Sequence, residues 1–322
     1  MIAATCYPRR AVHLCSRALS AGTRPSFDLQ SHSLQSDGEL PPAEVVASAA
    51  AAGVELLALT DHDSVDGIHE AAAAAAQTAI RLVPATEITS IDDAAPDLHV
   101  LGYLIDATDA ALREQLSASR GEREGRAQRM AEALSELGFA IDESFLRARS
   151  EQGKTIGRPH LAQAVVRHPD NAERLRREGL TDPSAFLVAY LIEGRPAFRP
   201  RLGPSVARSI ELIHDAGGVA VWAHPFWDVS SPAEVLSTLD RFVALGLDGV
   251  EAFYVTHTRD QTRLLVDRCA ELGLLTTGSS DFHGPHHREF QHFLAFETYG
   301  LAPNLGPISE VGPISEAGAQ TL

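Results

Sequence analysis

Histidines and carboxylates gather in short polar stretches of this chain, in a pattern suited to binding divalent metal ions. The stretch "SFDLQSHSLQSDGELPP" (Ser26–Pro42) offers His32 and Asp37, and it places Gln30 where a third ligand would be expected. Imidazole and carboxylate groups together favour transition metals. Three interpretations are open for this stretch: a metal site with one weak ligand, a site that has lost its chemistry, or a polar loop.

The other candidate ligands stand mostly at the ends of apolar stretches. They are Asp61, His62 and Asp63, then Glu87, His224, and Asp281 with His283, while His99 begins its own apolar stretch. A single loop histidine is usually solvated or hydrogen-bonded, and Ser-Asp-Gly is an ordinary turn sequence. The complete set predicts a multi-metal site, because divalent metals neutralise carboxylates and bind imidazoles.

Alternating helical and strand-like segments must position these residues. The sequence predicts helices over Pro41–Gly53 and residues 67–79, and strands over Val54–Thr60, residues 80–88 and Leu98–Ile105. The alternation resumes after residue 200. Strands that alternate with helices imply a parallel sheet or barrel, in which the loops at the C-terminal strand ends share one face. Ligands that are distant in sequence can therefore converge there.

Three segments depart from this alternation. Residues 109–200 are rich in Arg and Glu and mostly helical in pattern, which predicts a helical insertion between barrel parts at 27–108 and 201–302. Residues 1–26 contain four arginines and no acidic residue, and we interpret them as a disordered extension, with a transit segment as the alternative. Residues 303–322 repeat the sequence GPISE and are predicted to be a disordered tail.

Composition restricts the possible functions. The 322 residues carry 27 basic and 43 acidic side chains, a formal charge of 27 − 43 = −16, which disfavours broad electrostatic binding of nucleic acid. No stretch approaches the roughly 20 apolar residues that span a bilayer. Three cysteines indicate no disulfide framework, so we expect a reducing, cytoplasmic location. An anionic substrate would need local compensation from metals or arginines.

Five motifs, in order, resemble those of the polymerase and histidinol phosphatase (PHP) family of metal-dependent phosphoesterases. They are "DLQSHS" followed by "SDG", the "TDHD" of Thr60–Asp63, Glu87 with "HVLGY", the "AHP" of Ala223–Pro225, and "GSSDFH". The resemblance covers roughly Phe27–Ala302. It is closest to the branch with a helical insertion, whose "IGRPHLA" and "EGRPAF" patterns also occur here.

The resemblance implies an α/β fold, a distorted (β/α)7 TIM-like barrel with a mostly helical insertion domain. It implies hydrolysis of the 3'-phosphate of nucleoside 3',5'-bisphosphates, with trimming of short RNA from the 5' end as a related activity. The partner would be a small nucleotide or short oligoribonucleotide, with no membrane, duplex nucleic acid or protein partner implied. The alternatives are another phosphomonoester such as histidinol phosphate, or a non-catalytic nucleotide-binding relative.

The resemblance also implies two or three divalent metals, with Mn²⁺ as the first choice and Fe²⁺ or Zn²⁺ as alternatives. The first would take His32, Glu87 and Asp281, the second Glu87, His99 and His224, and the third Asp37, His62 and His283. Gln30 occupies the position of the family's first histidine ligand. An amide oxygen is a weaker donor than imidazole, so we expect weaker binding of the first metal and an active site.

The remaining expectations concern catalysis and substrate binding. His257 is a candidate acid for the leaving group or a residue that only lines the pocket. Asp63 and its neighbour Asp61 are expected to orient His62. An insertion covering the barrel mouth would place Arg158, His160 and Arg195 near the second phosphate of the substrate, although a salt-bridged helix surface explains these residues equally well.

Overall fold

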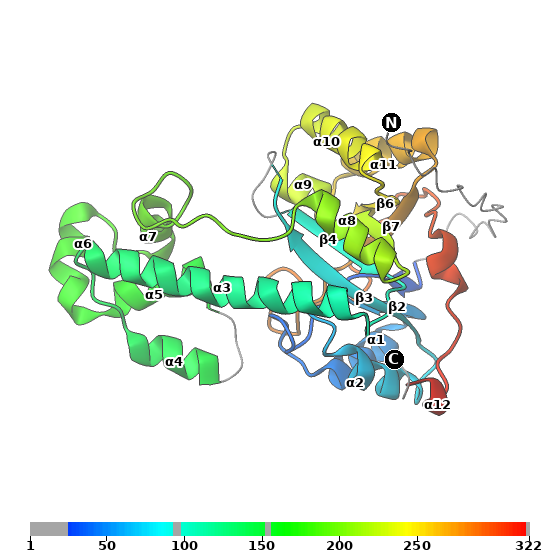
Figure 1. Cartoon of the computed structure of the whole chain (residues 1–322), viewed down its shortest axis with the longest axis horizontal. Coiled ribbons are helices and arrows are strands. Elements are labelled where there is room, and N and C mark those ends of the chain that lie inside the picture. Colours follow the sequence, from blue (N-terminus) through cyan, green and yellow to red (C-terminus); the bar gives the residue numbers. More distant parts are fainter. Residues whose placement is uncertain (1–24, 93–97, 152–155, 320–322) are drawn as a thin grey trace, which may run out of the picture.

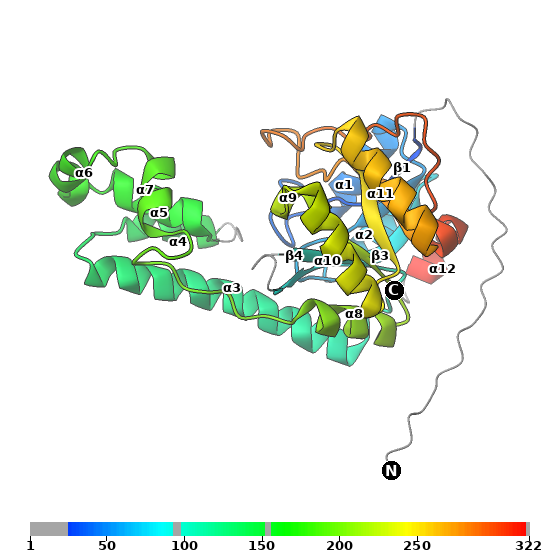
Figure 2. The ribbon, with the colours of Figure 1, turned by 90° about the horizontal axis from the view of Figure 1, so that it is seen from above.

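Seven strands form one nearly closed sheet with helices outside it in the computed structural model, which describes residues 25–92, 98–151 and 156–319 (Figures 1 and 2). The strands are β1 Phe27–Asp28, β2 Leu56–Leu59, β3 Arg81–Ser90, β4 Leu98–Tyr103, β5 Val219–Trp222, β6 Gly249–Tyr254 and β7 Leu275–Ser279. They lie side by side in chain order. A hydrogen bond of 3.1 Å from Leu29 N to Gly278 O joins the first strand to the last. The predicted distorted (β/α)7 barrel is confirmed.

Strand β4 is the source of the distortion, because it runs antiparallel to both of its neighbours. Its residue His99 pairs with Thr89 of β3, and the carbonyl of His99 accepts a hydrogen bond of 3.1 Å from Ala223 N beyond β5. A reversed strand begins at the edge where the other strands end. This direction explains why His99 begins its apolar stretch whereas most candidate ligands follow theirs.

The helices around the barrel form where the sequence supplies caps and an apolar stripe. Helix α1 (Pro42–Ala52) has proline in its first turn and ends at Gly53, whose φ of 88° is the left-handed conformation that favours glycine. Its side chains Val45 and Val46 are buried together with helix α2 (Ile68–Ala75). The remaining barrel helices are α8 Val206–Asp215, α9 Pro225–Asp228, α10 Pro232–Ala244 and α11 Arg259–Leu272.

One long helix connects the barrel to the predicted helical insertion. Helix α3 (Ala110–Glu136) has 27 residues, which corresponds to a length of about 40 Å. Its residues Leu112 and Leu116 pack in the barrel core, whereas Ala127 and Met130 belong to a separate core. The helix therefore contributes to two hydrophobic cores.

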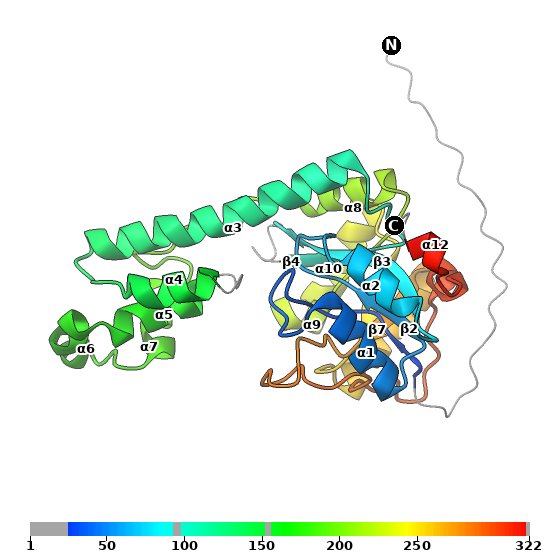
Figure 3. The ribbon, with the colours of Figure 1, turned by 90° about the horizontal axis from the view of Figure 1, so that it is seen from below.

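The separate core belongs to a group of short helices. They are α4 Glu143–Glu151, α5 Arg158–Arg167, the 3-10 turn Pro169–Asn171, α6 Ala172–Glu178 and α7 Pro183–Tyr190. Phe139 and Phe186 pack edge to face there, with their ring centroids 5.0 Å apart. Figure 3 shows that the group stands beside the barrel, facing the side from which the loop before α1 and the loop after β7 project.

The predicted disordered tail is wrong for residues 303–319. A 3-10 helix (Gly306–Glu310) and helix α12 (Glu316–Ala319) form there, and Ile308 is fully buried. Arg81 Nη1 donates hydrogen bonds of 2.9 Å to Ser309 O and 3.2 Å to Val311 O. Each GPISE repeat supplies one isoleucine, and Ile314 packs against the cluster below α1 and α2. The repeat is thus a packing motif.

At the other end of the chain, residues 1–24 of the expected extension lie outside the described residues. Ser26 already belongs to the barrel, because its carbonyl accepts a hydrogen bond of 2.7 Å from Glu55 N. In the described part of the chain, no helix has both the length and the apolar character needed to cross a membrane.

Candidate metal centre

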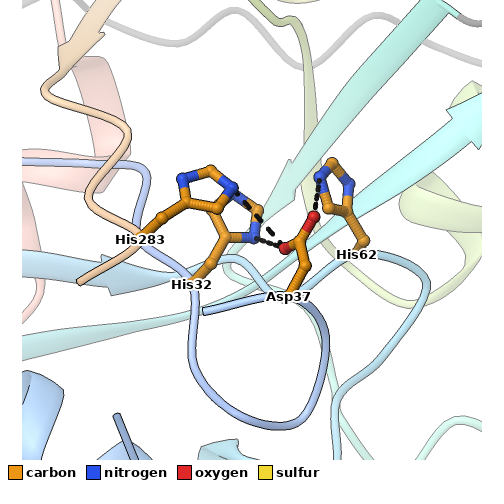
Figure 4. A group of neighbouring side chains, drawn as sticks. All are labelled: His32, Asp37, His62 and His283. Atoms are coloured by element: carbon orange, nitrogen blue, oxygen red, sulfur yellow. Dashed lines mark ion pairs between the residues drawn. The ribbon is translucent and has the colours of Figure 1, made fainter. Parts of the chain in front are cut away.

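The strand ends bring all eight candidate ligands to one end of the barrel. They comprise five histidines, two aspartates and one glutamate: His32, Asp37, His62, Glu87, His99, His224, Asp281 and His283. His32, His62 and His283 come from three different strand ends, and Figure 4 shows them around Asp37. The arrangement agrees with the convergence that the strand–helix alternation predicts.

Glu87 lies at the centre of this group, fully buried. Its Oε1 is 2.7 Å from His99 Nδ1 and 3.2 Å from His224 Nε2. Its Oε2 is 3.1 Å from His32 Nε2 and 3.5 Å from His62 Nδ1. Because the two oxygens face different imidazoles, one carboxylate can serve two metal ions.

The separations within the three implied donor sets are compatible with metal binding, and the division into three sets stays a prediction. His32 Nε2 is 3.1 Å from Asp281 Oδ1, and His99 Nδ1 is 3.3 Å from His224 Nε2. In the third set, Asp37 Oδ2 is 3.7 Å from His62 Nε2, and Asp37 Oδ1 is 3.5 Å from His283 Nε2. Ligands bound at about 2.0–2.2 Å lie about 3.0–3.5 Å from one another around one ion, which is close to these separations.

Two buried atoms of the first set lie in contact with each other. His32 Nε2 is 3.1 Å from Asp281 Oδ1 and 3.1 Å from Glu87 Oε2, so one imidazole nitrogen faces two carboxylates. Either a proton on His32 or a bound cation would neutralise this buried negative charge.

The carboxylates of the group are ionised. Burial alone would raise the pKa of Asp281, but the charges of His283 and His32 outweigh it and hold that pKa at about 2. Glu87 is affected in the same way, because His62 and His99 hold its pKa well below the usual range despite burial. Ionised carboxylates are the form that binds metal.

Gln30 turns its amide nitrogen toward this centre in this structure, and its role as a weak metal ligand stays a prediction. Its amide nitrogen donates a 2.9 Å hydrogen bond to Glu87 Oε2, and its amide oxygen accepts one of 3.3 Å from Ser279 Oγ. Ser279 also bonds Glu251, whose Oε2 accepts from His224 N at 2.9 Å. Gln30 thus belongs to a buried network that fixes Glu87.

The aspartates on either side of His62 have other partners than expected. Asp61 accepts hydrogen bonds of 2.7 Å from Ser33 N and from Ser36 Oγ, which hold the loop that carries His32. Asp63 accepts 3.0 Å hydrogen bonds from Thr89 N and Arg123 Nη2. Within the described residues, neither carboxylate bonds the His62 ring. The predicted orienting role is therefore wrong for both, because each carboxylate is already engaged elsewhere.

His257 lies beside the centre with properties that disfavour an acid. Its Nδ1 is 3.1 Å from Ala252 O, and its ring packs against Phe226 and Tyr254. Burial lowers the pKa of His257 to about 4, so the ring is neutral at pH 7. These observations favour the second interpretation, in which His257 lines the pocket.

The three expected substrate-binding residues lie in the insertion. Arg158 is the half-buried first residue of α5, and Arg195 is exposed on the turn after α7. His160 Nδ1 accepts a 3.0 Å hydrogen bond from Gly157 N and so caps α5. Burial and the charge of Arg149 lower the pKa of His160 to about 4, which leaves it uncharged at neutral pH. Any contact of these residues with phosphate stays a prediction.

Sequence reasoning missed two arginines and one tyrosine. Partial burial lowers the pKa of Arg149 at the end of α4, and the Asp37 carboxylate partly offsets this effect. Arg123 of α3 lies 3.0 Å from Asp63 Oδ2. Tyr254 donates a 2.8 Å hydrogen bond from its hydroxyl to Asp281 Oδ2. Tyr254 is the last residue of an apolar strand, close to where the ligands of other strands lie, and this position in the sequence could have identified it.

Known proteins provide an independent comparison. Residues 28–152 match the PHP domain. A 5'-3' exoribonuclease of Haemophilus influenzae is 33% identical over 259 residues, which cover 80% of this chain and 90% of that protein. A 3',5'-nucleoside bisphosphate phosphatase of Chromobacterium violaceum is 33% identical over 261 residues, which cover 81% of this chain and 88% of that protein.

A solved structure resembles the fold as a whole. An amidohydrolase from Chromobacterium violaceum, with bound sulfate and no metal, superposes with a TM-score of 0.69 at 29% identity, covering 92% of this chain and 97% of that one. The relatives thus extend across the barrel and the insertion. With its ligands gathered at one barrel end and relatives that match along most of their length, the chain belongs to the PHP family of metal-dependent phosphoesterases.

Proposed function

We propose that this enzyme hydrolyses the 3'-phosphate of nucleoside 3',5'-bisphosphates and removes nucleotides from the 5' end of short RNA. The observation that carries the proposal is the position of Glu87 between four imidazoles at the mouth of the barrel. The names of the two relatives that are 33% identical supply the substrate class.

Both reactions are the same bond cleavage. The oxygen of water attacks phosphorus, the bond between phosphorus and O3' of the first nucleotide breaks, and O3' leaves with a proton. In a bisphosphate the attacked phosphoryl group becomes inorganic phosphate, whereas in RNA it stays on the remaining chain as its new 5'-phosphate. In both cases the first nucleotide keeps its own 5'-phosphate, so one site can serve both substrates.

We assign the metals to the three donor sets implied by the family, with Mn²⁺ first and Fe²⁺ or Zn²⁺ as alternatives. Bound divalent ions neutralise phosphoryl oxygens and lower the pKa of water to near neutrality. Glu87 holds two of the sets together, and Tyr254 fixes Asp281 through its hydroxyl. Gln30 restrains Glu87 through the hydrogen bond from its amide nitrogen to Oε2.

The 5'-phosphate requires positive charge in an otherwise acidic protein. We assign it to the side of the site that faces the insertion, where Arg123 lies 3.0 Å from Asp63 and α4 carries Arg149. Arg158, the first residue of α5, is a further candidate for binding the 5'-phosphate. Arginine matches a phosphate with two parallel hydrogen bonds, which also fixes the orientation of the nucleotide. We place the enzyme in the cytoplasm, in keeping with the free, buried thiol of Cys269.

A substrate panel with added Mn²⁺ tests the proposal. Adenosine 3',5'-bisphosphate should release one phosphate and leave adenosine 5'-monophosphate, and a 5'-phosphorylated RNA trimer should release 5'-mononucleotides. Adenosine 5'-monophosphate and histidinol phosphate should release none. The matched inactive variant is Glu87→Gln. Phosphate release from histidinol phosphate alone would indicate the other phosphatase, and tight nucleotide binding without turnover would indicate a non-catalytic relative.

A further inference from the structure

Trp227 is an exposed aromatic side chain beside the metal centre. The side chain lies on α9, three residues after His224, and its backbone N donates a 2.8 Å hydrogen bond to His224 O. Its exposed fraction is 52%. Among the described Phe, Tyr and Trp side chains, it is the single exposed one. The position of this indole next to the charged groups of the centre, more than its exposure, points to a ligand that covers it.

Two buried aromatic residues hold the indole in place. Its ring centroid is 6.4 Å from that of Tyr254, at an interplanar angle of 79°, and 5.8 Å from that of Phe290, at 56°. Phe290 is stacked in turn on His287, with centroids 5.2 Å apart and an angle of 13°. Neither Tyr254 nor Phe290 lies parallel to the indole. The neighbours therefore fix the ring without stacking on it.

The same residues connect the indole to the reacting end of the site. Tyr254 bonds Asp281 Oδ2 at 2.8 Å and packs against His224, with ring centroids 5.3 Å apart. Phe290 packs against His283, with centroids 5.5 Å apart. Through Tyr254 and Phe290, Trp227 is thus connected to one donor of each proposed set, namely Asp281, His224 and His283. In a bound nucleotide, the ribose separates the base from the reacting phosphate in a comparable way.

We propose that Trp227 is the stacking platform for the base of the first nucleotide, an inference that rests on the proposed function. Stacking uses the face that every base has, so it predicts binding of purines and pyrimidines alike. A base stacked on an aromatic side chain typically tightens binding by about 5- to 150-fold. A site that must release successive nucleotides from RNA of any sequence requires such tolerance.

Intrinsic fluorescence provides a direct test, because the chain has two tryptophans and Trp222 is fully buried. Titration of the Mn²⁺-loaded protein with AMP or UMP should quench the emission, whereas ribose 5-phosphate, which lacks a base, should not. The quenching should disappear in Trp227→Phe. An unchanged quench in that variant would overturn the proposal.

Calorimetry measures the contribution of the base. The wild type should bind AMP and UMP at least about tenfold more tightly than ribose 5-phosphate, and Trp227→Ala should bind all three alike. Trp227→Phe should recover part of the difference. Leu245→Ala, at an exposed position after α10, is the control and should bind as the wild type does. Equal weakening of ribose 5-phosphate and AMP by Trp227→Ala would indicate a structural role and overturn the proposal.

Turnover of adenosine 3',5'-bisphosphate separates this inference from the proposed function. Turnover by a wild type that binds AMP no better than ribose 5-phosphate would overturn the base platform alone. Base-dependent binding that is lost in Trp227→Ala, in a protein that cleaves neither substrate, would support the platform and overturn the proposed activity.

Discussion

The amide nitrogen of Gln30 lies 2.9 Å from Oε2 of Glu87. The hydrogen bond restrains the carboxylate that four histidines share. The set proposed for the first metal then consists of His32, Glu87 and Asp281. In this structure Gln30 therefore acts on a proposed ligand, Glu87, through its amide nitrogen.

Removing this donor should weaken metal binding. In Gln30→Ala, Glu87 Oε2 loses a buried hydrogen bond, and groups that orient metal ligands typically change affinity about 10- to 100-fold. Calorimetric titration of the metal-free protein with Mn²⁺ measures the change. Gln35→Ala, on the exposed part of the same loop, is the control. Unchanged affinity in Gln30→Ala would show that Glu87 needs no restraint.

Gln30→His restores an imidazole at the same position. We expect a higher affinity for the first metal, visible as tighter binding in the same titration, and an unchanged order of preference in the substrate panel. The extra donor adds a bond to the metal but no contact with the substrate. A wild type without activity and an active Gln30→His would contradict this view of Gln30.

Tyr254→Phe tests the hydroxyl that bonds Asp281. The ring and its contacts stay, so the fold and the indole of Trp227 should be unaffected, while Asp281 Oδ2 loses a 2.8 Å hydrogen bond. We expect Mn²⁺ affinity to fall by about 10- to 100-fold. Metal content after dialysis, measured by plasma mass spectrometry, gives a readout that does not depend on turnover.

Asp63 connects the barrel to the insertion, and its removal should loosen that connection. The buried carboxylate lies 3.0 Å from Arg123 and 3.5 Å from Arg201. Losing one partner of a buried charge pair typically costs about 3–5 kcal/mol, so Asp63→Asn should unfold at clearly lower urea concentration. Hydrogen exchange should increase along α3 near Arg123.

Asp66 provides the matched control for this experiment. It pairs with Arg113 at 3.4 Å and with Arg120 at 3.3 Å, but 41% of its side chain is exposed. Exposed pairs contribute about 0–1 kcal/mol, so Asp66→Asn should leave the urea midpoint nearly unchanged. Similar losses in Asp63→Asn and Asp66→Asn would contradict the special role of the buried carboxylate.

A surface histidine gives a pH prediction that is independent of metals. The hydrogen bond of 2.8 Å to Asp248 raises the pKa of His214 in the folded protein, although partial burial opposes it. The pair therefore stabilises the fold below the unfolded pKa of about 6.5, and this stability is lost as pH rises through the folded pKa.

His214→Gln should consequently be less stable than the wild type at pH 5.5, by less than about 1 kcal/mol because the pair is partly exposed. The difference should become smaller at pH 9. Urea unfolding in EDTA at both pH values measures it, and His69→Gln at an exposed position of α2 is the control. A stability difference between the wild type and His214→Gln that grows with pH would contradict this prediction.

The sequence could predict the barrel and the convergence of the ligands because both depend on local patterns. Apolar stretches followed by His62 or Asp281 mark strand ends, and parallel strand ends share one edge. The direction of β4 could not be predicted. Its apolar stretch has no feature that distinguishes a parallel from an antiparallel strand, and only the position of His99 at its start was unusual.

Partners that are distant in the sequence account for the remaining differences. The orientation of the Gln30 amide is set by Glu87 and by Ser279, which lies 249 positions away. The order in residues 303–319 depends on Arg81 and on the apolar cluster that receives Ile314. The GPISE repeat by itself carries no information about contacts with residues so distant in the sequence.

The pairing of Thr89 with His99 makes one donor of the centre sensitive to strand register. Successive side chains of a strand point to opposite faces, so a shift of one residue would turn the imidazole outward and present Leu98 or Val100 in its place. A slip of β4 by one residue against β3 would thus remove one donor from the centre, so the ladder of hydrogen bonds between these two strands also determines whether the second metal set is complete.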